Sequence, residues 1–177
     1  RAGGVFGVRV VGTTAPRAAG HQEEFLKRAP EALQGPVEVI SGQEEARLIH
    51  LGVQSRWPHP TQRVLMVDIG GGSAELILSE HGRMEQAFSK PLGALRLKEV
   101  FLKSDPPDPR ELHRMEEYIQ ERIVDAVKRF GNSPYDRAIA TSATAAAVIC
   151  AVNRVPRAKR ETADRKPTLS RTCRLVR

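Results

Sequence analysis

Apolar and polar positions along the chain follow two periods, and the change from one to the other predicts the secondary structure. Helices are predicted where apolar residues recur every three or four positions, over 21–33, 41–54, 109–130 and 143–152. Strands are predicted where short apolar runs are bounded by glycine, proline or polar residues, over 7–13, 37–40, 64–69, 75–78, 84–89 and 137–142. Three consecutive strands followed by alternating helices and strands indicate an α/β chain.

Capping residues and prolines refine the helix boundaries. Ser41 and Glu44 have the spacing of a capping box, which starts the second helix at this point. Asp108 followed by Pro109 starts the long third helix in a similar way. Pro30 lies inside the first helical pattern, and because proline lacks a backbone N–H we expect that helix to kink or end there.

The segment from Asp68 to Glu75 is a glycine-rich turn between two predicted strands. Its three glycines and one serine, residues 70–73, allow backbone N–H groups to approach a ligand closely, as in phosphate-binding turns. A P-loop or dinucleotide fingerprint is excluded because the turn has no lysine and a strand follows it. Carboxylates on both sides of a phosphate turn favour a bridging Mg²⁺. A plain glycine-rich hairpin is the alternative at this level.

Glu45 is a candidate for an inward-facing carboxylate. The helix that contains it has a buried stripe formed by Ala46, Ile49 and Val53. At 100° per residue, Glu45 projects about 40° from Ile49, so it lies at the edge of this stripe and faces inward. The alternative is a rim glutamate in a surface ion pair, which is common at helix edges.

The charge of the chain is concentrated at one end. The sequence has 177 residues, with 40% hydrophobic content, which is enough for a core. Of its 28 Lys and Arg and 21 Asp and Glu residues, nine and two lie in 154–177, which leaves 19 of each in 1–153. The net charge of +7 therefore belongs to residues 154–177, which we expect to be a disordered basic tail and not a specific nucleic-acid site.

The remaining composition favours a cytoplasmic protein. No stretch approaches the length of a membrane span, and the first residues lack the apolar core of a signal peptide. Cys150 lies in an apolar run and is expected in the core, whereas Cys173 lies in the tail. These two cysteines have no metal-site spacing and predict no disulfide framework, which fits a reducing compartment.

Three segments carry a resemblance to a known family. Residues 39–49, 67–76 and 89–97 have the sequences VISGQEEARLI, VDIGGGSAEL and SKPLGALRL. In this order and at this spacing they resemble the exopolyphosphatase and guanosine pentaphosphate phosphohydrolase (Ppx/GppA) family, over about residues 8–150. The order of elements also resembles the ribonuclease-H-like unit that actin-like ATPases contain twice. We therefore predict two half-related domains, over 1–58 and 59–153, the first incomplete at its N-terminus.

The resemblance implies a chemistry and a set of roles. The implied reaction is hydrolysis of a phosphoanhydride bond in inorganic polyphosphate or a guanosine polyphosphate, with Mg²⁺ as cofactor. Glu45 would be the general base that orients or deprotonates the attacking water. Asp68 and Glu75 would hold the metal ion. The implied phosphate ligands are Arg17, Gly70, Gly71, Gly72 and Ser73.

The chain also departs from the family pattern. The family's first phosphate loop, of the type Asp-x-Gly-Ser, is absent from the sequence. Thr14 replaces a serine, Ala74 stands where a threonine is common, and Ala143 stands where the family often has glycine. We therefore expect a truncated or degraded member with little or no hydrolase activity of its own.

Three other interpretations of the chain stay open from the sequence. The chain could be an inactive remnant that binds phosphate or a nucleotide, or a sugar or acetate kinase of the same fold. It could also be a polyanion-binding module driven by residues 154–177. The strand end at Thr141 and Ser142 could approach a ligand as well as pack closely. The oligomeric state is undetermined, with a homodimer as one alternative, and no membrane partner is expected.

Overall fold

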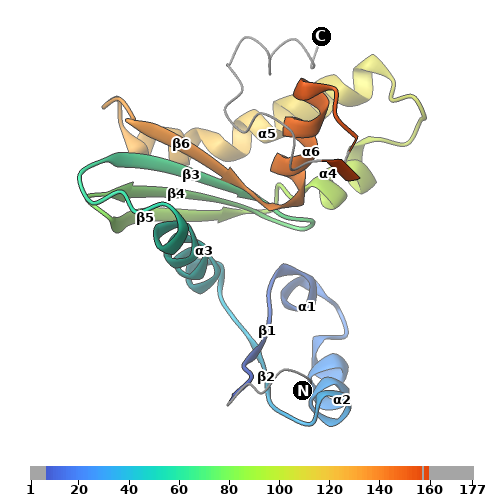
Figure 1. Cartoon of the computed structure of the whole chain (residues 1–177). Helices are drawn as coiled ribbons and strands as arrows, with labels where there is room; N and C mark the ends of the chain where they lie inside the picture. Colours follow the sequence, from blue (N-terminus) through green and yellow to red (C-terminus); the bar gives the residue numbers. More distant parts are fainter. Residues whose placement is uncertain (1–6, 157, 160–177) are drawn as a thin grey trace.

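The computed structural model describes residues 7–156 and 158–159 and confirms the predicted α/β class (Figure 1). Its helices are α1 (Thr14–Ala18), α2 (Gln22–Leu33), α3 (Gly42–Arg56), α4 (Ala94–Phe101), α5 (Pro109–Phe130) and α6 (Ser142–Asn153). Its strands are β1 (Val10–Gly12), β2 (Val37–Val39), β3 (Arg63–Ile69), β4 (Ala74–Glu80), β5 (Arg83–Lys90) and β6 (Arg137–Thr141).

The larger sheet has the strand order β5-β4-β3-β6. β3, β4 and β5 form an antiparallel meander, and β6 pairs with β3 in parallel. A parallel neighbour requires a crossover connection, and the segment that contains α4 and α5 provides it. The three predicted strands in succession are therefore confirmed. α1 and α4 were not predicted as helices, because five and eight residues contain too few turns to establish a period.

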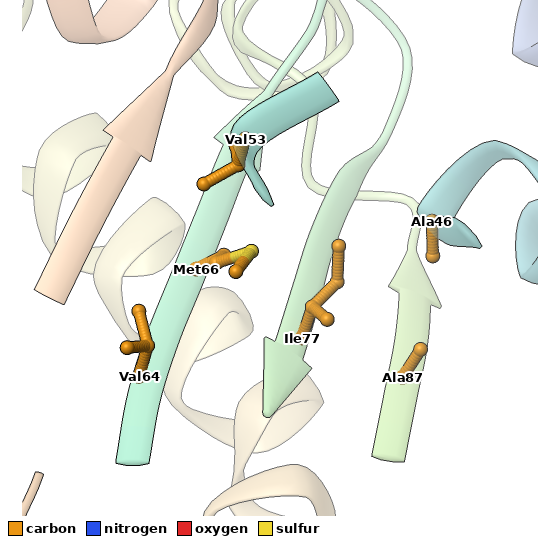
Figure 2. Packing of buried hydrophobic residues seen from close by; sticks show 6 residues of the cluster. All are labelled: Ala46, Val53, Val64, Met66, Ile77 and Ala87. Atoms are coloured by element: carbon orange, nitrogen blue, oxygen red, sulfur yellow. The ribbon is translucent and has the colours of Figure 1, made fainter. Parts of the chain in front are cut away.

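One face of this sheet is covered by α3. The buried stripe predicted on α3 packs on alternate residues of the three meander strands, as Figure 2 shows. Because side chains alternate between the faces of a strand, every second residue of β3 and β4 points toward α3. The buried cluster consists of Ala46, Val53, Val64, Met66, Ile77 and Ala87.

The opposite face is covered by α4 and α5. Two further buried clusters lie there, formed by Ala74, Leu92 and Leu97 and by Leu78, Ala126 and Phe130. Figure 1 shows α3 and α5 on opposite sides of the sheet. Burial on both faces explains why β3 has an unbroken apolar run instead of the alternation of a half-exposed strand.

The predicted start of α5 is confirmed in detail. Asp108 accepts a hydrogen bond from the backbone N–H of Arg110, at 2.7 Å, and forms a capping box with Glu111. The helix ends before Gly131, whose φ of 73° is readily adopted by glycine. α5 is long but carries many charges, and no helix in the described part of the chain combines the length and apolar character needed to cross a bilayer.

α2 confirms the helix predicted over 21–33 and corrects the expectation of an end at Pro30. The helix continues past Pro30 for one further turn to Leu33. Proline at this position removes the hydrogen bond to the carbonyl four residues earlier, but the chain closes the helix with its own cap. Gln34 adopts a left-handed conformation, and the N–H of Gly35 donates to the carbonyl of Pro30 at 3.1 Å.

The first part of the chain forms a second, smaller sheet. β1 and β2 pair in parallel over three residues each. α3 follows β2, but its buried residues Ala46 and Val53 pack on the larger sheet. The region predicted as a first domain, residues 1–58, therefore contributes one helix to the packing of the larger sheet. The domain boundary itself stays a prediction.

The C-terminal predictions fall partly within the described residues. Cys150 of α6 is buried, as expected for a small core residue. α6 ends at Asn153, and Arg154 follows it in a left-handed conformation. Cys173 and residues 160–177, which contain most of the predicted tail, lie outside the described residues.

A buried polar cluster of His50, Ser79 and His59 lies at the far end of β4 from the glycine turn. Ser79 Oγ lies 3.0 Å from His50 Nε2 and 2.8 Å from His59 Nε2. His59 Nδ1 lies 2.9 Å from the carbonyl of Trp57, which only accepts, so this nitrogen carries the hydrogen. With both rings neutral, His50 donates to Ser79, and Ser79 donates to His59. Every bond then has one donor and one acceptor.

This cluster predicts a pH dependence of stability. Burial, together with the nearby His59, lowers the pKa of His50 below its ordinary value of 6.5. Below about pH 6.5, His50 binds a proton in the unfolded chain but not in the folded chain. The free energy of unfolding therefore falls as the pH decreases. We expect denaturant melts between pH 7.5 and 5 to show this loss. The slope should flatten in His50→Gln.

The control for this prediction is His81→Asn, at the exposed turn between β4 and β5. His81 has a φ of 50°, which asparagine tolerates well. The control should keep the wild-type pH slope. An unchanged slope in His50→Gln would show that this ring does not carry the effect.

Candidate functional site

Four polar side chains form one row across the larger sheet, next to the glycine turn. The strand register pairs Ser89 with Glu75, Glu75 with Asp68, and Asp68 with Thr141. Directly paired residues point to the same face of a sheet, which here is the face covered by α3. Ser89 Oγ donates to Glu75 Oε1 at 2.8 Å, and Thr141 Oγ1 donates to Asp68 Oδ2. Each carboxylate therefore has a hydroxyl donor on its outer side.

Glu75 is the most constrained of these carboxylates. Only 1% of its surface is exposed. Burial raises its pKa above the ordinary value, and the negative charges of Glu45 and Asp68 act in the same direction. Hydrogen bonds from Ser89 and Ser73 oppose the rise. Like charges paired directly across two strands are destabilising, so this pair is more easily explained by function than by stability.

The raised pKa of Glu75 predicts that Glu75→Gln stabilises the folded chain. At pH 7.5 ionised Glu75 disfavours folding, and its removal should raise the free energy of unfolding by roughly 0.5–1 kcal/mol. The gain should shrink as the pH falls toward the ordinary glutamate value of 4.5, because the folded chain then protonates Glu75 anyway. Denaturant melts of the wild type and Glu75→Gln at several pH values measure this difference in the free energy of unfolding.

Glu80→Gln, at the other end of β4, is the matched control. Glu80 lies 3.8 Å from the Arg63 guanidinium and has no carboxylate partner in the strand register. Its replacement should not stabilise the chain. A loss of stability in Glu75→Gln at every pH would contradict the assignment of unfavourable charge to Glu75.

The carbonyl groups of the three glycines in the turn are all held by α4, whereas that of Ser73 accepts from the N–H of Gly70. The N–H of Ala94 donates to Gly70 O at 2.9 Å, and the N–H of Arg96 donates to Gly71 O at 3.0 Å. Arg96 Nε donates to Gly72 O at 3.0 Å. Among the described residues, by contrast, the N–H groups of Gly71 and Gly72 have no acceptor. The turn thus offers unpaired backbone donors, as an anion site requires.

Two of the glycines are needed for close packing around this turn. A Cβ on Gly72 would lie 2.7 Å from Thr14 Cγ2. A Cβ on Gly93, just before α4, would lie far inside 3.0 Å of the backbone of Gly71 and Gly72. Glycine at these positions therefore allows α1 on one side and α4 on the other to contact the turn.

A chain of hydrogen bonds connects Glu45 with the glycine turn. Arg17 Nη2 lies 3.2 Å from Glu45 Oε2 and 3.0 Å from Thr14 Oγ1. Thr14 Oγ1 lies 2.7 Å from Ser73 Oγ, and Ser73 in turn bonds to Glu75. The predicted base and the predicted metal ligand therefore belong to one network, although they come from different elements.

The start of α3 places Glu45 in this network. Ser41 Oγ caps the helix by accepting from the N–H of Glu44 at 3.1 Å, as predicted. A Cβ on Gly42 would lie 2.5 Å from Ser89 Cβ, so the first turn of α3 lies directly against β5. The Glu45 side chain is 16% exposed, which agrees with the predicted inward position. Only the Ser41 half of the predicted capping box forms, because the Glu44 carboxylate binds Arg47 at the surface and not the backbone N–H of Ser41.

The structure thus brings the predicted site residues together and adds others. Arg17, Glu45, Asp68, Glu75 and the glycine turn form one region. Thr14, Ser89 and Arg96 were not predicted as site residues. Counting strand register outward from the turn would have found Ser89, because it pairs with Glu75. No local pattern indicates Thr14 or the side-chain bond of Arg96. The functional roles of all these residues stay predictions.

The donor set fits the predicted Mg²⁺ in its chemistry. Within the described residues, no group of three or more His, Cys, Asp or Glu side chains is arranged to hold a metal ion. Mg²⁺, however, commonly uses one or two carboxylates together with water and substrate phosphates. Asp68 and Glu75 are paired carboxylates beside unpaired backbone donors. Burial and then the negative charges of Glu45 and Asp68 raise the pKa of Glu75, and a bound cation would offset that negative charge.

Solved structures of other proteins have a similar fold and a similar sequence. The Aquifex aeolicus PPX-GPPA enzyme is 30% identical, with a TM-score of 0.65, and the match covers 84% of this chain and 48% of that one. An exopolyphosphatase from Cytophaga hutchinsonii is 29% identical, with a TM-score of 0.78, over 90% of this chain and 50% of that one. This chain therefore spans about half the length of these relatives. These matches show that the chain shares the α/β fold of the Ppx/GppA structures, and the predicted relationship to actin-like ATPases stays a prediction.

The sequence also matches a model of a protein family. A model of the Ppx/GppA phosphatase family matches residues 3–168, which includes the glycine turn, α3 and α4. The three sequence segments that carry the resemblance all lie in this range. The chain therefore belongs to the Ppx/GppA phosphatase family.

Proposed function

We propose that the region around the glycine turn binds the terminal phosphates of inorganic polyphosphate or guanosine pentaphosphate and supports hydrolysis of a phosphoanhydride bond. The observation that supports it most is the connection between unpaired turn amides and an inward carboxylate. Gly71 and Gly72 offer N–H groups to phosphate oxygens, and Glu45 belongs to the same hydrogen-bonded network.

In the proposed reaction, each group has one task. Glu45 accepts a proton from water, whose oxygen forms a bond to the terminal phosphorus. The bridging P–O bond breaks, and its electron pair leaves with the shortened chain. The turn amides hold the transferred phosphoryl oxygens. Asp68 and Glu75 would hold Mg²⁺, which supplies positive charge to the phosphate oxygens when bound.

A second candidate is binding without turnover, and the contacts of Arg17 favour it. The Arg17 guanidinium already donates to three protein oxygens: Ile40 O at 2.7 Å, Thr14 Oγ1 and Glu45 Oε2. A phosphate-binding arginine would have to exchange some of these bonds for phosphate oxygens. With Arg17 held as it is, the turn amides could bind phosphate while the base stays paired.

Two measurements on the 177-residue chain test the proposal and separate the candidates. Titration of tripolyphosphate with Mg²⁺ should show binding for both candidates. Release of inorganic phosphate from long-chain polyphosphate and from guanosine pentaphosphate should occur only for the first. Absence of any binding would overturn both, whereas binding without release would leave the second.

A further inference from the structure

The orientation of the glycine turn depends on a small number of bonds from α4. In a trans peptide, the carbonyl of one residue and the N–H of the next point in opposite directions. The carbonyls of Gly70, Gly71 and Gly72 are all held toward α4. The N–H groups that follow them, those of residues 71, 72 and 73, are therefore directed away from α4.

The glycines of the turn need these bonds from α4 to hold their peptides in one orientation. The first two peptides of the turn lie between glycines and the third lies between Gly72 and Ser73. Because glycine allows a peptide to rotate with little steric penalty, local conformation alone does not give the preference that keeps the three amides on one side. An external set of donors must supply that preference. α4 provides it, since Gly93 allows its first turn to contact the backbone of the glycine turn directly.

Arg96 contributes two of the three bonds. Its backbone N–H holds Gly71 O, and its side-chain Nε holds Gly72 O, each at 3.0 Å. The backbone bond exists for any residue in the helix except proline. The Nε bond, however, belongs to the side chain alone, and it is the one that directs the N–H of Ser73. The half-buried position of Arg96 limits competition from water for this bond.

We propose that Arg96 is a positioning residue, whose Nε–H fixes the last peptide plane of the glycine turn so that the Ser73 N–H faces the phosphate site. The inference rests on the proposed phosphate binding for its ligand. Its physical basis is the hydrogen bond to Gly72 O, and the positive charge of the guanidinium is not required.

Three substitutions separate the hydrogen bond from the charge. In Arg96→Gln, the Nε2 of glutamine lies the same number of bonds from Cα as the Nε of arginine, so the donor is retained without the charge. In Arg96→Met, a methyl group takes that position. Arg96→Lys retains the charge but places its nitrogen one bond further along the side chain. Lys98→Met, on the exposed side of α4, removes one positive charge from the same helix and is the matched control.

Calorimetric titration with tripolyphosphate and Mg²⁺ gives the first test. We expect Kd to rise about tenfold in Arg96→Met and Arg96→Lys, the effect of losing one aligned hydrogen bond. Kd should stay within about twofold of wild type in Arg96→Gln and Lys98→Met. Weak binding in Arg96→Gln with normal binding in Arg96→Lys would show that charge is what matters, and would overturn the inference. Equal binding in all variants would overturn it as well.

A second measurement needs no ligand. Nitrogen-15 relaxation should show the Ser73 amide ordered in the wild type and in Arg96→Gln, and more mobile on the picosecond to nanosecond timescale in Arg96→Met. An unchanged Ser73 amide in Arg96→Met would overturn the inference even if phosphate binds. If the wild type binds no tripolyphosphate, the proposed function fails, and the relaxation data still decide the role of Arg96.

Discussion

Replacement of Glu45 by glutamine is expected to reduce any phosphate release from polyphosphate by about 100-fold or more, while the Kd for tripolyphosphate stays within about twofold. Glutamine keeps the size of the side chain and an oxygen that accepts from Arg17, so the network to Thr14 and Ser73 should persist. The amide does not accept a proton at neutral pH, so it does not replace the carboxylate as a base. The measurement is released phosphate, with binding followed separately by calorimetry.

Glu44→Gln is the control for this experiment. Glu44 precedes Glu45 on α3 and binds Arg47 at 2.7 and 2.8 Å, away from the glycine turn. The control should retain the wild-type rate of release. Equal release in Glu45→Gln and wild type would exclude Glu45 as the base. A wild-type chain that binds tripolyphosphate but releases no phosphate would instead support the second candidate, binding without turnover.

Gly93→Ala is expected to destabilise the chain by roughly 1–3 kcal/mol and to weaken tripolyphosphate binding about tenfold or more. The φ of Gly93 is −68°, which alanine adopts without strain, so the effect isolates the added methyl group. That methyl would meet the backbone of Gly71 and Gly72, and backbone has no side-chain rotamer through which to yield. The turn and α4 must separate, and the three carbonyl bonds to α4 would lengthen together.

A second glycine offers a contrasting substitution. Gly52 lies inside α3, is exposed, and has no atom within 4 Å of an added Cβ. Gly52→Ala should raise the free energy of unfolding by about 0.5–1 kcal/mol, because alanine favours the helix. Tripolyphosphate binding should not change. Thermal melts and titrations on both variants measure the contrast, and a Gly93→Ala variant with wild-type stability and binding would show that α4 does not hold the turn.

The parts of the site that could be predicted from the sequence are those set by residues close together in the chain. Glu45 was placed inward from a cap and a helical period, both of which act within a few residues, and its side chain is indeed mostly buried. Asp68 and Glu75 flank one short turn, so their pairing across the two strands follows from the hairpin itself. The helix period gave the correct end of α2, at Leu33, although Pro30 lies inside it, because one missing hydrogen bond does not outweigh the cap that follows it.

The contacts that were not predicted are hydrogen bonds between segments that are distant in the sequence. Thr14 and Ser73 are 59 residues apart, and His50 and Ser79 are 29 apart, so no common period or motif relates them. Arg96 lies in a helix of eight residues, and its position in the chain does not reveal that its Nε reaches Gly72 O, 24 residues earlier. Such contacts exist only once the sheet and its helices have packed.

Local chemistry alone was enough to indicate an α/β chain, a glycine turn with flanking carboxylates, and a capped helix with an inward glutamate. These features depend on backbone preference and on side-chain period, which are properties of neighbouring residues. Packing decided which way the turn amides point and which groups share a hydrogen bond with Glu45 and Glu75. Glycine peptides have little preferred direction of their own, so the donors of α4, placed by the tertiary fold, orient the carbonyls of the three glycines.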